Sequence, residues 1–310
     1  MELIRGIHNI RDRHRGCVLT IGAFDGVHRG HQAVLKHVLK VAAEKNLPST
    51  VVTLEPLPRE YFAPLKAPAR LMSFREKYEA LSALGVDRLL LIPFNEKIQR
   101  MEAAPFITTV FVDKLGAKHV VVGDDVRFGH DGAGDFGLLQ QLGRDHDFGV
   151  EDTASLKLDD LRVSSTRIRE LLEAGNFDDA EQLLGRPYSI SGKVVYGQQL
   201  GRSLGSPTAN LELHRLRAAM SGVYAVRVQV GEEQQLRPAV ANVGTRPTVD
   251  NLVKAILEVH LLDFDKDLYG QRLKVEFREK IREEEKFESL DALKEQIGRD
   301  IETARSLLTA

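Results

Sequence analysis

The stretch GCVLTIGAFDGVHRGHQAVLKHVLKVAAEK, residues 16–45, decides the fold of the first half of the chain. Its opening run, Gly16–Phe24, is apolar and rich in β-branched side chains, which predicts a buried strand. The run Ala33–Lys45 carries apolar side chains at helical spacing, which predicts a helix. A strand that turns directly into a helix is typical of an α/β fold.

The turn between this strand and helix carries two histidines, His28 and His31, three residues apart. Glycines and an acid accompany them: Gly22, Gly26, Gly30 and Asp25. The start of a helix favours anions through its backbone N–H groups and its dipole, and glycines let the backbone approach a ligand. We therefore favour a phosphate site over an ordinary turn. A zinc site is the weaker alternative, because no third ligand lies at a characteristic spacing.

The composition is that of a soluble globular protein with room for two domains, since the 310 residues are 43% hydrophobic and 28% charged. A net charge of −2 argues against a protein that binds long nucleic acid. The N-terminus lacks an apolar signal segment, and the longest uncharged run, Ala103–Val112, is too short to span a membrane. With one cysteine, Cys17, we expect a cytoplasmic protein with no membrane partner.

Strands and helices alternate along the first half. Strands are expected at 49–56, 87–94 and 118–125, and helices at 73–85, 105–117, 165–175 and 177–185. This order predicts a parallel sheet with crossover helices, whose ligands bind at the carboxyl ends of the strands. The G-x-G-x-x-G at Gly132–Gly137 lies several residues beyond a strand, so it predicts a loop and not a dinucleotide site.

The pattern changes at Arg186–Pro187. Short alternating strands follow, and a final helix at Ser289–Leu308 has an apolar stripe, which predicts an antiparallel β-barrel covered by a helix. We therefore predict two domains, 1–186 and 187–310.

Three later motifs suggest chemistry. SSTRIRE (Ser164–Glu170) is either a capped helix start or a second phosphate clamp using Arg167 and Arg169. GQQLGRSLGSPTANL (Gly197–Leu211) is either a long hairpin loop or a polyphosphate loop, with Thr208 and Asn210 as neutral oxygen ligands for Mg²⁺. Glu258 lies in an apolar run, where a carboxylate forms a salt bridge or acts as a general base.

Together these motifs resemble the bifunctional bacterial riboflavin kinase/FAD synthetase family over nearly the whole chain. The first half is similar to its Rossmann-like nucleotidyltransferase through HRGH (His28–His31) and SSTRIR. The second is similar to its kinase barrel through GSPTAN (Gly205–Asn210) and EVHLLDFDKDLYG (Glu258–Gly270). The resemblance implies that ATP phosphorylates riboflavin to FMN, and that a second ATP adenylylates FMN to FAD with release of pyrophosphate. Mg²⁺ would accompany ATP, and flavins are substrate and product.

The resemblance also implies roles for single residues. His28 and His31 would stabilise charge on the ATP phosphates, and Glu258 would be the base for the ribityl hydroxyl. The implied ATP-binding residues are Gly22, Phe24, Asp25, Gly30, Asp125, Ser164, Thr166 and Arg169 in the first domain and Gly201, Gly205, Pro207, Thr208 and Asn210 in the second. Thr208 and Asn210 would also serve Mg²⁺.

Two positions depart from the family pattern: Gly132 stands where an arginine is expected, and Leu57 where a polar residue is expected. Both lie near the expected adenylyl-transfer site. Two other functions therefore stay open, a riboflavin kinase with a weakened adenylyltransferase half and a non-catalytic flavin-sensing protein. The presence of His28, His31 and Glu258 favours an enzyme, because binding alone requires none of them.

Overall fold

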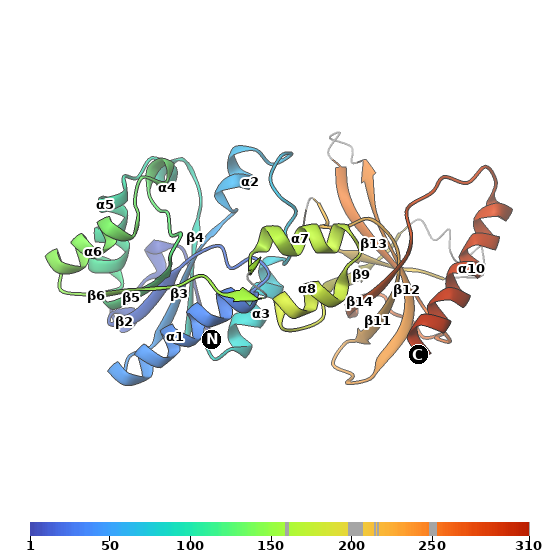
Figure 1. The fold of residues 1–310 in the computed structure, drawn as a ribbon, viewed down its shortest axis with the longest axis horizontal. Helices are drawn as coiled ribbons and strands as arrows, with labels where there is room; N and C mark the ends of the chain where they lie inside the picture. Colours follow the sequence, from blue (N-terminus) through green and yellow to red (C-terminus); the bar gives the residue numbers. More distant parts are fainter. Residues whose placement is uncertain (159–160, 198–206, 214, 216, 248–252, 310) are drawn as a thin grey trace. The chain divides into compact units, whose positions relative to one another are not determined.

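The computed structural model describes residues 1–158, 161–197, 207–213, 215, 217–247 and 253–309 (Figure 1). The chain forms two compact units. Unit 1 contains Met1–Pro68 and Phe74–Ser164, and unit 2 contains Ala69–Ser73 and Ser165–Ala310. The boundary expected at residue 186, as the limit of independent folding, stays a prediction.

Unit 1 is built on a parallel sheet, as the sequence predicted, and this sheet has six strands. Its strands are β1 (Glu2–Arg5), β2 (Cys17–Ile21), β3 (Ser49–Glu55), β4 (Arg88–Pro93), β5 (Ala117–Gly123) and β6 (Gly149–Thr153). Their order in the sheet is β1-β4-β3-β2-β5-β6. The direction of winding reverses between β2 and β5. Open α/β sheets bind ligands at such a switch point, at the carboxyl ends of the strands.

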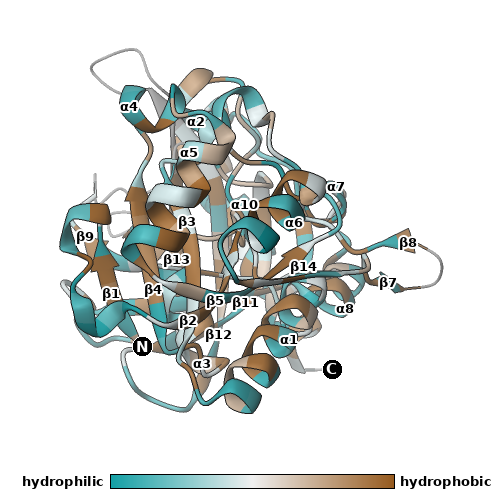
Figure 2. Ribbon diagram, turned by 90° about the vertical axis from the view of Figure 1, so that its left-hand side faces the viewer, coloured by the Kyte–Doolittle hydropathy of each residue, from teal (hydrophilic) through white to brown (hydrophobic). Residues whose placement is uncertain are grey.

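Helices cover both faces of this sheet, and Figure 2 shows hydrophobic residues along the strands between them. The helices of unit 1 are α1 (Arg29–Lys45), α2 (Pro58–Phe62), α3 (Phe74–Ala83), α4 (Glu96–Gln99), α5 (Ala103–Ile107) and α6 (Phe136–Asp145). On one face, Val38 and Val41 of α1 pack with Val18 and Val121. The larger core on the other face includes side chains from α5 and α6 and from a π-helical segment, Thr108–Lys114. The expected helix at 105–117 is this segment together with α5.

Helix α6 corrects one prediction. The loop expected over Gly132–Gly137 ends at Asp135, whose Oδ1 accepts a hydrogen bond from the Leu138 backbone N–H at 3.0 Å. Asp135 is therefore the N-cap of α6, and the helix begins inside the G-x-G-x-x-G stretch. Gly134 packs tightly against the Phe128 ring, where a Cβ atom would clash. Within this stretch, Gly134 thus serves packing and Asp135 serves capping.

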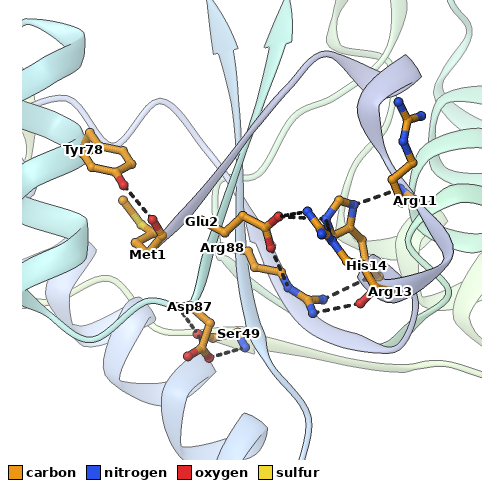
Figure 3. Close-up of polar contacts among 9 residues, drawn as sticks. All are labelled: Met1, Glu2, Arg11, Arg13, His14, Ser49, Tyr78, Asp87 and Arg88. Carbon is orange, nitrogen blue, oxygen red and sulfur yellow. Dashed lines mark hydrogen bonds and ion pairs between the residues drawn. The ribbon is translucent and has the colours of Figure 1, made fainter.

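The N-terminal strand β1, which sequence reasoning missed, is held at the edge of the sheet by polar contacts (Figure 3). Glu2 accepts a hydrogen bond from Arg13 at 2.6 Å and lies 3.1 Å from Nε2 of the buried His14. Arg88 of β4 donates to the backbone carbonyl oxygens of Arg13 and His14. The hydrogen bond with His14 is the main cause that lowers the pKa of Glu2. These contacts tie β1 to β4 through side chains as well as backbone.

Unit 2 is a closed antiparallel barrel with a covering helix, as predicted. Its strands are β9 (Ser189–Val195), β10 (Ala209–Glu212), β11 (Gly222–Val230), β12 (Leu236–Pro247), β13 (Val253–Leu261) and β14 (Arg272–Arg282), paired in the order β10-β13-β12-β11-β14-β9. Its helices are α7 (Ser165–Glu173), α8 (Phe177–Leu184) and α10 (Leu290–Thr309). A small hairpin in unit 1 pairs β7 (Lys157–Leu158) with β8 (Leu161–Arg162).

Two helices complete the hydrophobic core of unit 2. Helix α10 packs Ala304 and Leu308 near Ala225, and its buried Asp300 pairs with Arg282 of β14 at 2.8 Å. Helix α8 inserts Phe177 among the aromatic side chains of the barrel. Its ring lies 5.6 Å from that of Tyr224 and 6.0 Å from that of Phe277. Helix α8, which precedes residue 186, therefore contributes to the barrel core.

We predict that Phe177→Ala lowers the free energy of unfolding of unit 2 by about 3–5 kcal/mol, because it leaves a cavity among buried aromatic rings. Leu290→Ala is the control: this side chain is 65% exposed, and its loss should change stability by no more than about 0.5 kcal/mol. Urea unfolding of the full chain, followed by circular dichroism, measures both variants. Equal stability of the two variants would show that Phe177 of α8 does not stabilise the barrel core.

Candidate active sites

The turn after β2 places both predicted histidines at the start of α1. The helix begins at Arg29, earlier than the expected Ala33, so His28 is the N-cap and His31 lies in the first turn. His28 Nδ1 accepts a hydrogen bond from the His31 backbone N–H at 3.3 Å. When His28 is neutral, its proton therefore sits on Nε2, which makes that atom a donor.

The two imidazole rings stack, with centroids 3.6 Å apart and planes 18° apart, and the Phe24 ring lies 5.2 Å from that of His31. Burial is the main cause that holds the pKa of His31 well below 6.5, and the nearby His28 and Lys77 lower it further. His31 is therefore neutral at pH 7. It can stabilise an anion only by donating a hydrogen bond, because it carries no charge of its own.

The loop that leads into this turn is strained. Phe24 and Val27 have φ values of 47° and 40°, and a β-branched residue such as Val27 rarely adopts this conformation. Such strain costs about 1–3 kcal/mol per residue and concentrates at ligand clamps. Asp25, between them, is buried with 3% exposure. The loop is therefore held in one shape by its surroundings.

Gly22 and Gly30 lie in close contacts in the same turn. A Cβ atom on Gly22 would lie 3.0 Å from the Phe24 ring, and one on Gly30 would lie 3.2 Å from the His28 ring. The carbonyl oxygen of Val163 would lie 3.4 Å from that same atom on Gly30. The structure thus brings Ser164, the next residue, to the histidine turn.

Other predicted residues of the first site fall into two groups. Asp125 is exposed just beyond β5, on the other side of the switch point, and pairs with Arg162 at 2.5 Å. Thr166 and Arg169 belong to α7 in unit 2, where Arg169 donates to the Ala69 carbonyl oxygen at 2.5 Å. Arg167, the other arginine of SSTRIRE, pairs with Glu170 on the surface of α7. Arg169 thus joins α7 to Ala69 within unit 2, and its role in ATP binding stays a prediction.

Sequence reasoning missed an aromatic cluster at the carboxyl edge of the sheet. Tyr61 and Phe62 of α2 are 40% and 56% exposed, and both meet Phe94, which follows β4, edge to face. The sequence signal for this cluster was the adjacent pair Tyr61 and Phe62, shortly after the strand predicted at 49–56. Leu57, one of the two departures, directly precedes α2, and Gly132, the other, lies in a short turn with φ of 67°.

In unit 2 the register of the barrel aligns three polar side chains, Asn210 of β10, Glu258 of β13 and Asn242 of β12, which we call the polar row. Their sequence neighbours on each strand are buried: Ala209, Leu211, Leu257, Val259, Ala241 and Val243. Because side chains alternate along a strand, the polar row lies on the outer face of the barrel. The structure thus places Asn210 directly opposite Glu258, close enough for the two side chains to act in one site.

Two further contacts shape this site. Gly197, two residues beyond the end of β9, lies against the Asn210 amide, where a Cβ atom would clash. His260 donates from Nδ1 to the Pro207 carbonyl oxygen at 2.9 Å, which fixes the chain just before the half-buried Thr208. The alternation in EVHLLD, which puts Glu258 and His260 on one face, was a signal for this contact. Gly201 and Gly205 lie outside the described residues.

Within the ranges that the structure describes, no group of three His, Cys, Asp or Glu side chains could hold a metal ion. Burial raises the pKa of the Cys17 thiol to about 11, so this cysteine is not a thiolate at pH 7. Over the same ranges, every helix is too short or too polar for a membrane span.

Comparisons with known proteins also divide the chain into a first and a second part. The FAD synthetase family matches residues 10–167, and the riboflavin kinase family matches residues 184–308. Bifunctional riboflavin kinase/FMN adenylyltransferases are similar over the full length: that of Pseudomonas fluorescens is 52% identical over 99% of this chain and 98% of the relative. That of Escherichia coli K12 is 48% identical over 98% of this chain and 97% of the relative.

A solved structure described as a macrolide-efflux protein from Streptococcus pneumoniae is also similar. It is 30% identical with a TM-score of 0.77, and the match covers 98% of this chain and 99% of that one.

The pKa of His31 leads to a prediction about stability and pH. The pKa is lower in the folded chain than its ordinary value of 6.5, so below pH 6.5 the unfolded chain takes up a proton that the folded chain excludes. The stability of unit 1 should therefore be retained above pH 6.5 and fall as the pH drops below it. His31→Gln should make this decline shallower. Urea unfolding at pH 7.5 and 5.5 measures it, and equal declines in both proteins would contradict the assignment.

Proposed function

The chain belongs to the bifunctional riboflavin kinase/FMN adenylyltransferase family, and from this membership we propose how its residues share the two reactions. The enzyme phosphorylates riboflavin to FMN and adenylylates FMN to FAD. One observation carries the residue assignment: the chain has two chemically different sites, a histidine pair at a helix start and a carboxylate between two amides on a barrel. The match to FAD synthetase supports adenylyl transfer at the first site, and the match to riboflavin kinase supports phosphorylation at the second.

In the proposed adenylyl transfer, a phosphate oxygen of FMN attacks the α-phosphorus of ATP. The bond from that phosphorus to the β-phosphate oxygen breaks, and pyrophosphate leaves. The attacking phosphate is already ionised, so the reaction requires no general base. His28 and His31 would donate hydrogen bonds to the ATP phosphates, beside the backbone of Gly22 and Gly30, and stabilise the charge that develops. Ser164, next to this turn, would add a hydroxyl.

The flavin of this reaction needs an apolar surface. The exposed rings of Tyr61 and Phe62 and the half-buried ring of Phe94 lie at the carboxyl edge of the same sheet, where they would stack with an isoalloxazine ring. The roles implied for Phe24, Asp25, Asp125, Thr166 and Arg169 stay predictions. The same holds for a cytoplasmic location.

In the proposed kinase reaction, the terminal ribityl hydroxyl of riboflavin attacks the γ-phosphorus of ATP. The bond to the ADP oxygen breaks, and the hydroxyl proton passes to the Glu258 carboxylate. ATP would arrive with Mg²⁺, which neutralises phosphate charge. The neutral oxygens of Thr208 and Asn210 suit this metal beside phosphates, because Mg²⁺ keeps several waters and takes few protein ligands. Gly197 would keep the Asn210 amide in place beside Glu258.

One assay tests both halves of the proposal. The protein is incubated with ATP and Mg²⁺, once with riboflavin and once with FMN, and the flavins are separated by chromatography. The proposal requires FMN and FAD from riboflavin, and FAD from FMN. FMN as the sole product would indicate a kinase whose adenylyltransferase half is weakened, which would direct attention to Leu57 and Gly132. Unchanged riboflavin and FMN would indicate a flavin-binding protein without turnover.

We predict that His31→Ala lowers the rate of FAD synthesis from FMN by about 10²–10³-fold, the usual cost of losing one positioned hydrogen-bond donor. FMN formation from riboflavin should be unchanged. His37→Ala is the matched control, since His37 lies on the same helix but contacts Glu151 of β6. If His31→Ala made FAD at the parent rate, His31 would have no part in the transfer.

We predict that Glu258→Gln affects the two activities in the opposite way. This change preserves the shape of the side chain and removes the proton acceptor. This variant should fail to make FMN from riboflavin and still make FAD when FMN is supplied. Glu279→Gln, an exposed carboxylate of β14, is the control and should retain both activities. Phosphorylation of riboflavin by Glu258→Gln at close to the parent rate would transfer the role of base to another carboxylate, with Asp263 and Asp265 the next to test.

A further inference from the structure

Asn242 is the member of the polar row to which the reaction scheme above gives no role. It lies on β12 directly opposite Glu258, just as Asn210 does on β10. Its side-chain oxygen, Oδ1, is enclosed and accepts no hydrogen bond from the residues that the structure describes. Enclosed polar atoms in folded proteins are nearly always paired, and the exceptions are found where a ligand or a reacting group completes them. A hydrogen-bond donor for Asn242 Oδ1 is therefore expected from a ligand.

The neighbours of Asn242 on the outer face cannot supply that donor. Val223 lies opposite it on β11, and Val240 and Gly244 are the nearest residues on the same face of β12. Glu258, the polar neighbour, can only accept hydrogen bonds when ionised. The missing side chain of Gly244 admits a further carboxylate, that of Glu284, which is again an acceptor. Among the residues that the structure describes, these neighbours of Asn242 are thus apolar or acceptors.

The order of the polar row indicates what the donor is. Asn210, assigned above to Mg²⁺ and ATP, lies on one side of Glu258, and Asn242 lies on the other. In an in-line phosphoryl transfer, the attacking oxygen and the leaving ADP oxygen lie on opposite sides of the γ-phosphorus, so ATP and the acceptor molecule extend from it on different sides. With ATP on the Asn210 side of the base, the ribityl chain of riboflavin extends toward Asn242. That chain carries further hydroxyl groups beside the reacting one.

We propose that Asn242 binds the acceptor substrate of the kinase reaction, with Oδ1 accepting a hydrogen bond from a secondary hydroxyl of the ribityl chain. This contact holds the terminal hydroxyl against Glu258. Side chains opposite one another on neighbouring strands lie about 5 Å apart, a span that neighbouring hydroxyls of a polyol can bridge. The proposal rests on the assignment of Glu258 as the base, and it adds a determinant of flavin specificity to the kinase site.

The test compares Asn242→Leu, which has a similar volume and no hydrogen-bonding group, with a matched control. The control is Gln229→Leu, which removes a half-buried amide from β11, where its partners are Leu236 and Lys274. Kinase activity is measured in the full-length protein with riboflavin and with 2′-, 3′- and 4′-deoxyriboflavin, each of which lacks one secondary hydroxyl. KM for ATP, activation by Mg²⁺ and FMN adenylylation are measured alongside.

We predict that Asn242→Leu lowers kcat/KM for riboflavin about tenfold or more, the usual effect of one lost hydrogen bond in a site. The parent should show the same loss with one deoxyriboflavin, and Asn242→Leu should show no further loss with that analogue. KM for ATP, activation by Mg²⁺ and FMN adenylylation should change less than twofold. Gln229→Leu should behave as the parent does.

An equal penalty for riboflavin and all three analogues would make Asn242 a structural residue and overturn the proposal. A loss that higher Mg²⁺ restores would assign Oδ1 to the metal and overturn it as well. If circular dichroism shows that Asn242→Leu disrupts the barrel, the same comparison is made with Asn242→Ala. Failure of the wider assignment would look different, because there the parent itself would not phosphorylate riboflavin, or Glu258→Gln would remain active.

Discussion

The hydrogen bond from the His31 backbone N–H to His28 Nδ1 determines the geometry of the first site. It caps the helix, and it leaves the proton of neutral His28 on Nε2. With His28 fixed as the N-cap, His31 lies in the first turn of the helix, and the two rings stack. The helix itself starts where the sheet reverses its winding, so the same bond also places the pair where such sheets bind ligands. The strained Phe24 and Val27 lie in the loop that ends at this cap.

The second site depends on a constraint of a different kind, the register of a closed barrel. Asn210, Glu258 and Asn242 come from three strands and align because each strand is paired on both sides. A slip of one residue in β13 would turn Glu258 into the apolar interior and expose Leu257 or Val259. Burial of the inner face therefore maintains the alignment of the outer face. Gly197 and the His260–Pro207 hydrogen bond then position single groups within it.

The sequence predicted the fold where its signals were periodic, and it missed what depends on distant residues. The alternation of apolar runs predicted both the parallel sheet and the barrel. The edge strands β1 and β6 were missed because they are short and partly exposed, and polar contacts such as Glu2–His14 help to hold β1. The start of α1 was placed late because Arg29–Gln32 has no apolar periodicity and a histidine is an unusual N-cap. Glu258 was found from its neighbours in the sequence. Asn242 could not be found in this way, because it becomes notable only when β12 pairs with β13 and places it opposite Glu258.

The two sites use different side chains because their proposed nucleophiles differ in charge. A phosphate oxygen of FMN is ionised before it attacks, so its site needs donors that stabilise developing charge and needs no proton acceptor. Neutral imidazoles meet this need, and burial keeps His31 in that form at pH 7. A ribityl hydroxyl is a weak nucleophile until its proton is accepted, which requires a carboxylate. Asn210 and Asn242 flank Glu258 with neutral amides on the two neighbouring strands.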